Sequence, residues 1–252
     1  MKLLSPHPPE LPSVIMTNIR SLRHKVDELS AASVCIRPSL IALSETWLDS
    51  SVSDDEVALQ NYEILRQDRT ATKRGGGVCI FVRNDISYQV LSCLRLSPIF
   101  IESLWVYLRT SSILLCMLYI PPNLKAADHQ EVLNYVIESC DTALCLHPDS
   151  NIIMMGDFNQ FPTQQLSRFL DLIPMVDAPT RGNSILDQIL ISSHLSDDYN
   201  KAIAMPNIGK SDHLPLLFSP KEMSPQTKKP DIKYLFDLRE TNVSILSIYQ
   251  LA

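Results

Sequence analysis

The chain has 252 residues, of which 45% are hydrophobic and 20% charged, so it is a globular protein of one large or two small domains rather than a disordered, collagen-like or coiled-coil chain. Its net charge of −6 excludes binding to nucleic acid by bulk charge alone, and any such contact must therefore be local. The longest uninterrupted apolar run, residues 113–120, is too short to span a bilayer, so we expect no membrane segment.

The first elements of the chain alternate between strand and helix. Residues 1–12 contain four prolines and predict a disordered leader. Residues 13–17 predict a strand, and an amphipathic helix is expected from Ser21 to the residue before Pro38. Residues 40–43 predict a second strand, which a polar segment follows.

The middle of the chain is rich in β-branched, aromatic and aliphatic residues in short runs, which predicts antiparallel strands. The expected strands are 62–66, 78–83, 87–91, 101–109 and 113–120.

The second half returns to mixed patterns and predicts an α/β fold with mixed sheets in one domain, residues 13–219. Helical spacing is expected over 126–146 and 164–172. Residues 220–252 contain prolines and lysines and predict a linker or truncated tail, too short for a second core. The remaining strands are expected at 151–155, 185–191, 202–204 and 214–218.

Six cysteines occur without a C-x-x-C pair and without histidines at zinc spacing. Cys79 and Cys116 lie in apolar runs, where a thiol behaves as a small hydrophobic side chain. The N-terminal residues reach a proline before a signal-peptide core could form. These features predict a reduced, intracellular protein.

Polar side chains cluster at the ends of the apolar strands, where a sheet presents side chains to a ligand. They are carboxylates, amides, a tyrosine and a histidine, with no P-loop and no G-x-S-x-G motif. Oxygen-rich ligands of this kind suit Mg²⁺. The clusters occur at Asn18, Ser44–Trp47, Tyr119, Gly156–Asn159, Asp187 and Ser211–His213.

Each residue also has an ordinary structural explanation when it is considered alone. Asn18 could cap a helix and Glu45 could be a first-turn acid. Tyr119 could be a strand aromatic, and Asp157 and Asn159 could be turn residues. Asp212 and His213 could be a plain loop pair. Turn chemistry, however, does not require all of these types in this order.

Several short motifs that contain these residues occur in a set order along the chain. They are Asn18–Leu22, Ser44–Asp49, Arg74–Val78, Tyr119–Asn123, Gly156–Asn159, Pro179–Arg181 and Ser211–His213. A chain with these motifs in this order resembles the endonuclease domain of non-LTR (LINE-type) retrotransposons, in the superfamily of endonucleases, exonucleases and phosphatases that includes apurinic endonucleases and DNase I-like enzymes. The resemblance covers about residues 13–219.

The resemblance implies a four-layer α/β sandwich of two facing mixed sheets, each covered by helices. It also implies roles for the acids: Glu45 would bind Mg²⁺, with Mn²⁺ as an alternative ion, and Asp212 would help. Asp157, oriented by Asn159, would activate the attacking water.

The same resemblance implies that four other side chains contact the phosphate of the substrate or hold a residue that does. His213, held by Asp187, would contact the phosphoryl oxygen, and Asn18 and Tyr119 would complete the cradle. The residues expected to contact DNA are Arg20, Lys73, Arg74, Thr180, Arg181 and Ser211.

The function so implied is a Mg²⁺-dependent endonuclease that nicks one strand of double-stranded DNA and leaves a 3′-hydroxyl to prime reverse transcription. Two alternatives stay open: hydrolysis of another phosphate ester, and a catalytically inactive copy that binds DNA or protein. We expect a nuclear monomer whose partner is a reverse transcriptase domain that this chain lacks. Arg20 stands where apurinic repair relatives carry an acid, which argues against a dedicated repair enzyme.

Two local expectations concern loops. The basic segment Arg66–Arg74 could contact the DNA backbone or form a solvated hairpin, and both interpretations stay open. The six glycines gather at the motifs, so valine at Gly156 or Gly209 is expected to impair cleavage more than folding. Trp47 and Trp105 are expected in the core rather than as platforms for stacked bases.

Overall fold

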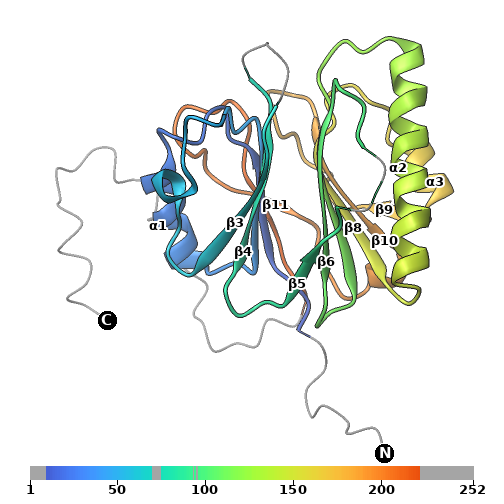
Figure 1. Cartoon of the computed structure of the whole chain (residues 1–252), viewed down its shortest axis with the longest axis horizontal. Helices are drawn as coiled ribbons and strands as arrows, with labels where there is room; N and C mark the ends of the chain where they lie inside the picture. Colours follow the sequence, from blue (N-terminus) through green and yellow to red (C-terminus); the bar gives the residue numbers. More distant parts are fainter. Residues whose placement is uncertain (1–9, 70–74, 93, 95, 222–252) are drawn as a thin grey trace, which may run out of the picture.

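The computed structural model describes residues 10–69, 75–92, 94 and 96–221. Within these residues the strands form two six-stranded sheets that pack face to face (Figure 1). The first sheet has the strand order β11 (Ile203–Ala204), β12 (Leu216–Phe218), β1 (Val14–Asn18), β2 (Leu40–Ser44), β4 (Val78–Arg83) and β3 (Tyr62–Gln67). The second has the order β5 (Tyr88–Val90), β6 (Glu102–Leu108), β7 (Ile113–Tyr119), β8 (Asn151–Asp157), β10 (Asp187–Ser192) and β9 (Leu172–Pro174).

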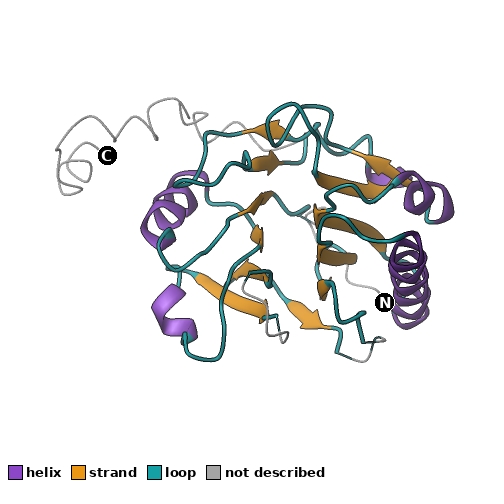
Figure 2. Ribbon diagram, turned by 90° about the horizontal axis from the view of Figure 1, so that it is seen from above, coloured by secondary structure: helices purple, strands orange, loops and turns teal. Residues whose placement is uncertain are grey.

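Helices cover the outer face of each sheet. Helix α1 (Val26–Ile36) and the 3₁₀ helix η1 (Asp54–Val57) pack on the first sheet. Helices α2 (Ala126–Leu146) and α3 (Gln164–Phe169) pack on the second. The view along the strands in Figure 2 shows the resulting order of helix, sheet, sheet and helix. The predicted four-layer α/β sandwich with two mixed sheets is therefore confirmed.

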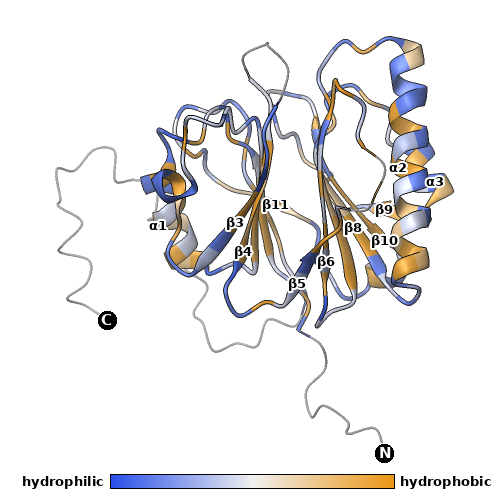
Figure 3. Ribbon diagram, in the orientation of Figure 1, coloured by the Kyte–Doolittle hydropathy of each residue, from blue (hydrophilic) through white to orange (hydrophobic). Residues whose placement is uncertain are grey.

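Most central strands are apolar on both faces, which explains why they form continuous apolar runs in the sequence (Figure 3). In β8, Ile153 and Met155 face the other sheet, whereas Ile152 and Met154 face α2. The same alternation holds in β7, where Met117 faces inward. The chain thus builds one core between the sheets and one under each helical layer.

On the face of each sheet that points to the other sheet, the apolar side chains give way to polar ones at one end of the strands, the upper end in Figure 1. Asp157 follows Ile153 and Met155 in β8 at the two-residue spacing that keeps a strand residue on one face. The other strands end in the same way. We call this set the polar rim: Asn18 of β1, Ser44 of β2, Glu102 of β6, Tyr119 of β7, Asp157 of β8 and Asp187 of β10.

The first predicted helix begins later than the sequence indicates. Its first turns were expected from Ser21, but α1 begins at Val26. Arg20 and Ser21 have φ values of +44° and +79°, which a helix does not allow. The N–H groups of Ser21 and Leu22 instead donate to the carbonyls that follow β2, each at 2.9 Å. This pairing continues the sheet into the site, so the helical prediction was wrong here.

The other boundaries differ less. The helix expected over 164–172 ends at Phe169, because Asp171 takes a left-handed φ of +50° and the chain turns into β9. Leu11 already packs against the core, and the carbonyl of Pro12 accepts a hydrogen bond from the buried Tyr199 hydroxyl. Among the described residues, no helix is long and apolar enough to cross a membrane.

Candidate active site

Asn18 and Asp157 join the two sheets at the polar rim. The Asn18 amide donates to Asp157 Oδ2 at 2.8 Å, and the Asn159 N–H donates to Asp157 Oδ1 at 3.0 Å. Asn159 has φ +46° and its side chain donates to the carbonyl of Ile120, which fixes the turn after β8. Both carboxylate oxygens are therefore held, and Asn18 orients an acid instead of capping a helix.

Asp187 and His213 form a second buried pair beside the first. Their Nδ1···Oδ2 distance is 2.7 Å, and both residues are at most 1% exposed. Asp187 is the register partner of Asp157 in the antiparallel β8–β10 pair, so the two carboxylates lie side by side. Among the described residues, Asp187 Oδ1 has no hydrogen-bond partner. The pairing leaves Nε2 as the histidine nitrogen available to a substrate.

The electrostatics of this cluster favour bound protons. Burial and then the charge of Asp187 raise the pKa of Asp157 to about 7, against the smaller opposing effect of the Asn18 hydrogen bond. Burial lowers the pKa of His213, but the hydrogen bond and charge of Asp187 together with the charges of Asp157 and Asp212 raise it, and the net shift is upward. Ligand atoms of the three residues lie within 4.8 Å of one another, so the trio could also hold a metal ion.

Glu45 follows β2 with a left-handed φ of +51° and is only partly buried. The Tyr119 hydroxyl donates to Oε1 at 3.0 Å and the Trp47 indole N–H donates to Oε2 at 3.2 Å. Burial and then the Glu45 charge raise the pKa of Tyr119, so its hydroxyl stays protonated as a donor. Each carboxylate oxygen keeps a further lone pair, which suits Glu45 to a divalent cation.

Trp47 differs from its prediction as a core residue, since it is half-buried and holds Glu45. In the sequence, this contact was indicated only by the position of Trp47 two residues after Glu45. Trp105 is buried, as expected, and donates to the Tyr135 hydroxyl at 3.1 Å.

Asp212 is clamped by two arginines. Arg20 contacts Oδ1 and Arg181 contacts Oδ2, each at 2.7 Å, and the three side chains are about two-fifths exposed. Burial raises the pKa of Asp212, but the Arg20 hydrogen bond and both arginine charges outweigh it and keep the pKa low. Both oxygens of Asp212 are thus in ion pairs, so a metal ion bound there would compete with two guanidinium groups that remain accessible at the rim. The metal-binding role of Asp212 stays a prediction.

Thr180 and Ser211, which were predicted to contact DNA, are buried beside the site. Thr180 Oγ1 accepts the N–H groups of Leu186 and Asp187, each at 3.1 Å, and Thr180 is 0% exposed. Ser211 Oγ donates to the Asn18 carbonyl at 2.7 Å. Both hydroxyls therefore brace catalytic candidates instead of facing a ligand. Lys73 and Arg74 lie outside the described residues.

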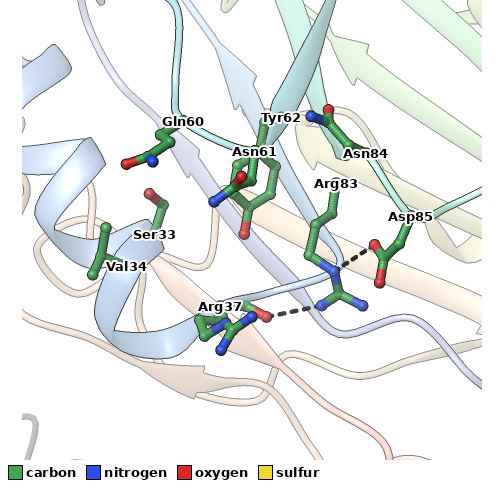
Figure 4. A pocket seen from close by; sticks show the side chains of 9 residues that line it. All are labelled: Ser33, Val34, Arg37, Gln60, Asn61, Tyr62, Arg83, Asn84 and Asp85. Carbon is green, nitrogen blue, oxygen red and sulfur yellow. Dashed lines mark hydrogen bonds and ion pairs between the residues drawn. The ribbon is translucent and has the colours of Figure 1, made fainter.

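A separate pocket of about 590 Å³ lies at the opposite end of the first sheet, between α1 and the start of β3 (Figure 4). Its only acidic lining residue, Asp85, is paired with Arg83 at 2.7 Å, and no histidine lines it. The Arg83 guanidinium also donates to the carbonyl of Arg37 at 3.0 Å. The pocket therefore lacks the acid and histidine set that the polar rim brings together.

No family model matches the chain, and no curated protein matches it by sequence. Its structure is nevertheless similar to solved structures. The endonuclease domain of TRAS1, a telomere-specific non-LTR retrotransposon, is 16% identical with a TM-score of 0.62, over 82% of this chain and 97% of that one.

Two phosphatases have a similar fold. The 3′ phosphatase NExo from Neisseria, bound to a product DNA hairpin, is 13% identical with a TM-score of 0.62, over 83% of this chain and 99% of that one. A mannosyl-6-phosphatase from Bacteroides thetaiotaomicron is 14% identical with a TM-score of 0.59, over 82% and 98%. At these identities the likeness concerns the fold, which DNA-acting and sugar-acting proteins share.

Proposed function

We propose that this chain, whose fold is that of the endonuclease/exonuclease/phosphatase superfamily, is a metal-dependent endonuclease that nicks one strand of DNA and leaves a 3′-hydroxyl. One observation carries the proposal: the Asn18–Asp157 hydrogen bond and the His213–Asp187 pair lie side by side at the rim between the two sheets. Such a set offers a base, a cationic donor and a neutral donor to one phosphate.

The residues divide the chemistry of phosphodiester hydrolysis between them. Asp157, with its pKa near 7, is suited to accept the proton of an attacking water at neutral pH. Asp187 favours the protonated form of His213, and in that form the imidazolium would stabilise the negative charge that develops on the phosphoryl oxygens. Asn18 keeps Asp157 in place and contributes an amide N–H dipole beside the same oxygens.

Glu45 would hold the metal ion, because its carboxylate is partly exposed and keeps free lone pairs while Tyr119 and Trp47 fix its orientation. A bound Mg²⁺, or Mn²⁺ in its place, supplies positive charge to the transition state. The chemistry of this donor set supports a bound divalent cation.

DNA is the substrate that the rim charges favour. Arg20 and Arg181 lie beside the site with about two-fifths of each side chain exposed, and guanidinium groups bind phosphate oxygens well. The retrotransposon-type motifs and the likeness to the TRAS1 domain support a role in priming reverse transcription in the nucleus. A reverse transcriptase domain would be the partner in that process, and we propose that this domain acts as a monomer.

The test is nicking of supercoiled plasmid in the presence of Mg²⁺ by the wild type and by Asp157→Ala and His213→Ala. We expect relaxed circles from the wild type and a rate lower by roughly 10²–10⁴-fold in each variant. Asp197→Ala and His194→Ala are matched controls, because both residues are exposed and follow the end of β10 that is opposite to Asp187. Nicks that a DNA polymerase extends without prior phosphatase treatment would confirm the 3′-hydroxyl.

Equal nicking by all the variants would indicate a contaminating nuclease and contradict the proposal. A second candidate is a 3′ phosphatase, which the likeness to NExo favours. Release of phosphate from a 3′-phosphorylated hairpin with no plasmid nicking would support that alternative. Plasmid binding in a gel shift without either reaction would support the inactive copy.

A further inference from the structure

Arg69 lies inside the molecule, although it belongs to the basic segment that could have contacted DNA. It follows β3 of the first sheet and reaches across to Glu102 of β6 in the second. Two contacts join them, Nε to Oε1 at 2.5 Å and Nη2 to Oε2 at 3.1 Å. Only 16% and 5% of the two side chains are exposed. The guanidinium is therefore fixed by a bidentate ion pair before any substrate arrives.

The same guanidinium contacts the ring of Tyr119. Its Cζ lies 5.4 Å from the ring centroid, which is within the range of a cation–π contact. Glu102 and Tyr119 are register partners in the β6–β7 pair, so the two side chains that Arg69 contacts lie next to each other on the same face of the second sheet. Because the Tyr119 hydroxyl donates to Glu45 Oε1, a continuous path of contacts runs from Glu102 through Arg69 and Tyr119 to Glu45.

Gly76 shows how closely the chain packs around this path. A Cβ on Gly76 would lie 2.3 Å from Arg69 Cζ, and its φ of +76° is one that glycine accepts readily. Its carbonyl accepts the N–H of Trp47 at 3.0 Å, and Trp47 donates to Glu45 Oε2. The glycine therefore lets the backbone pass against the guanidinium while it fixes the second donor to Glu45.

We propose that Arg69 is a positioning residue: held by Glu102 and Gly76, it fixes the Tyr119 ring and thereby sets the Glu45 carboxylate for a divalent cation. The inference rests on the proposed function, in which Glu45 holds the metal. A buried ion pair alone is weak evidence for stability, because apolar side chains of similar volume often serve as well. The path from Arg69 to the carboxylate gives this pair a second role.

Arg69→Met alone would leave the Glu102 charge buried and unpaired, and could simply unfold the protein. The informative variant is therefore Arg69→Met combined with Glu102→Met, which replaces both charges by apolar side chains of similar length. We expect its melting temperature to stay within a few degrees of the wild type. We expect its affinity for Mn²⁺, measured by calorimetry, and its kcat for plasmid nicking to fall roughly 10–100-fold, as for other partners of metal ligands.

Arg66 offers a matched control three residues earlier. Its guanidinium is also held internally, by Asp68 at 2.5 Å and Asp54 at 3.0 Å and by backbone carbonyls, but within the described part of the chain it contacts neither Tyr119 nor Glu45. We expect Arg66→Met to lower the melting temperature without changing Mn²⁺ affinity. Arg69→Lys keeps a cation near the ring and should retain part of the affinity.

A double-mutant cycle separates positioning from general structure. If Arg69 acts through the Tyr119 hydroxyl, the two methionine substitutions should change Mn²⁺ affinity less than about twofold in a Tyr119→Phe background. Two results would overturn this inference but not the proposed function, provided that the wild type nicks DNA. One is that the two methionine substitutions lower Mn²⁺ affinity as much in the Tyr119→Phe background as in the wild type, and the other is that they leave Mn²⁺ affinity unchanged in the wild-type background. A wild type that binds Mn²⁺ but does not nick DNA would overturn the proposed function and leave the inference standing. A wild type that binds no Mn²⁺ would overturn the inference as well.

Discussion

The two ends of the space between the sheets are built from the same strands but from opposite kinds of residue. At the end away from the site, inward positions carry apolar side chains such as Val14, Leu40 and Ile113, all 0% exposed. At the polar rim the same inward positions carry acids, amides and hydroxyls. Asn18 lies four residues after Val14 on the same strand and the same face, and it contacts a carboxylate.

The difference teaches how this fold separates stability from chemistry. At the end away from the site, burial of apolar side chains stabilises the fold by roughly 25 cal/mol for each Å² of apolar surface removed from water. The rim instead buries two neighbouring carboxylates, Asp157 and Asp187, and charges in a buried site cost stability unless they are paired. Substitutions along one strand should therefore move from a loss of stability to a loss of activity as they approach the rim.

The largest effect on folding is expected at Gly156, between the last apolar residue of β8 and Asp157. A Cβ there would lie 1.8 Å from the Leu118 carbonyl oxygen, a backbone atom that cannot move aside. We expect Gly156→Ala to give little folded protein by circular dichroism. This prediction differs from the one drawn from the sequence, that a substitution at Gly156 would impair cleavage more than folding, because the structure places the Leu118 carbonyl against this position.

Gly209→Ala is the comparison for that variant. Its Cβ would meet the flexible Lys25 side chain at 2.7 Å, so the expected cost comes mainly from its φ of +60°, about 1–2 kcal/mol. A Gly156→Ala variant as stable as Gly209→Ala would contradict the close packing of β7 and β8.

A smaller effect is expected at Met155, two residues before Asp157 and on the same face. Met155 is buried in the core between the sheets, and Met155→Ala should lower the free energy of unfolding by roughly 2–5 kcal/mol. Its kcat for plasmid nicking should change little at a temperature where the variant is folded. Urea unfolding and nicking assays of the same preparation test both parts, and a large loss of kcat would show that the two ends are not separate.

A further effect concerns the dependence of stability on pH. Because the pKa of Asp157 is raised to about 7 in the folded protein, its protonated form favours folding at about pH 4 and below, and this stability is lost as the pH rises toward 7. The raised pKa of His213 acts in the same direction, since stability is lost as the pH rises through its folded value. In EDTA, we expect the melting temperature to fall between about pH 4 and about pH 7, the range set by Asp157.

Asp157→Asn removes the first of these two titrations and should flatten that dependence. The variant would also be inactive in the nicking assay. The same substitution would therefore abolish activity and, above about pH 7, stabilise the folded protein, because no ionised carboxylate is buried at this position. An equally steep pH dependence in the variant would show that Asp157 does not titrate in this range.

Much of the site could be anticipated from the sequence because its residues follow apolar strands directly. Asn18, Tyr119 and Asp157 each complete the alternation of a strand, so their position on an inward face follows from spacing. The contacts of Arg69 could not be anticipated, because Glu102 lies 33 residues away and on the other sheet. Nothing local distinguishes it from Arg66, which has the same charge in the same segment.

Local patterns in the chain were sufficient to predict the α/β class, the order of the strands along the chain and the polar residues at their ends, because side-chain alternation and turn chemistry act over a few residues. Which strand ends meet depends on the packing of the whole molecule. This packing paired Asp157 with Asp187, closed Asp212 between two arginines and turned Arg69 inward. These contacts depend on the order of the strands in each sheet and on packing between the sheets. They join residues that are far apart in the sequence, and pairs of opposite charge at such separations produce no periodic pattern in the chain.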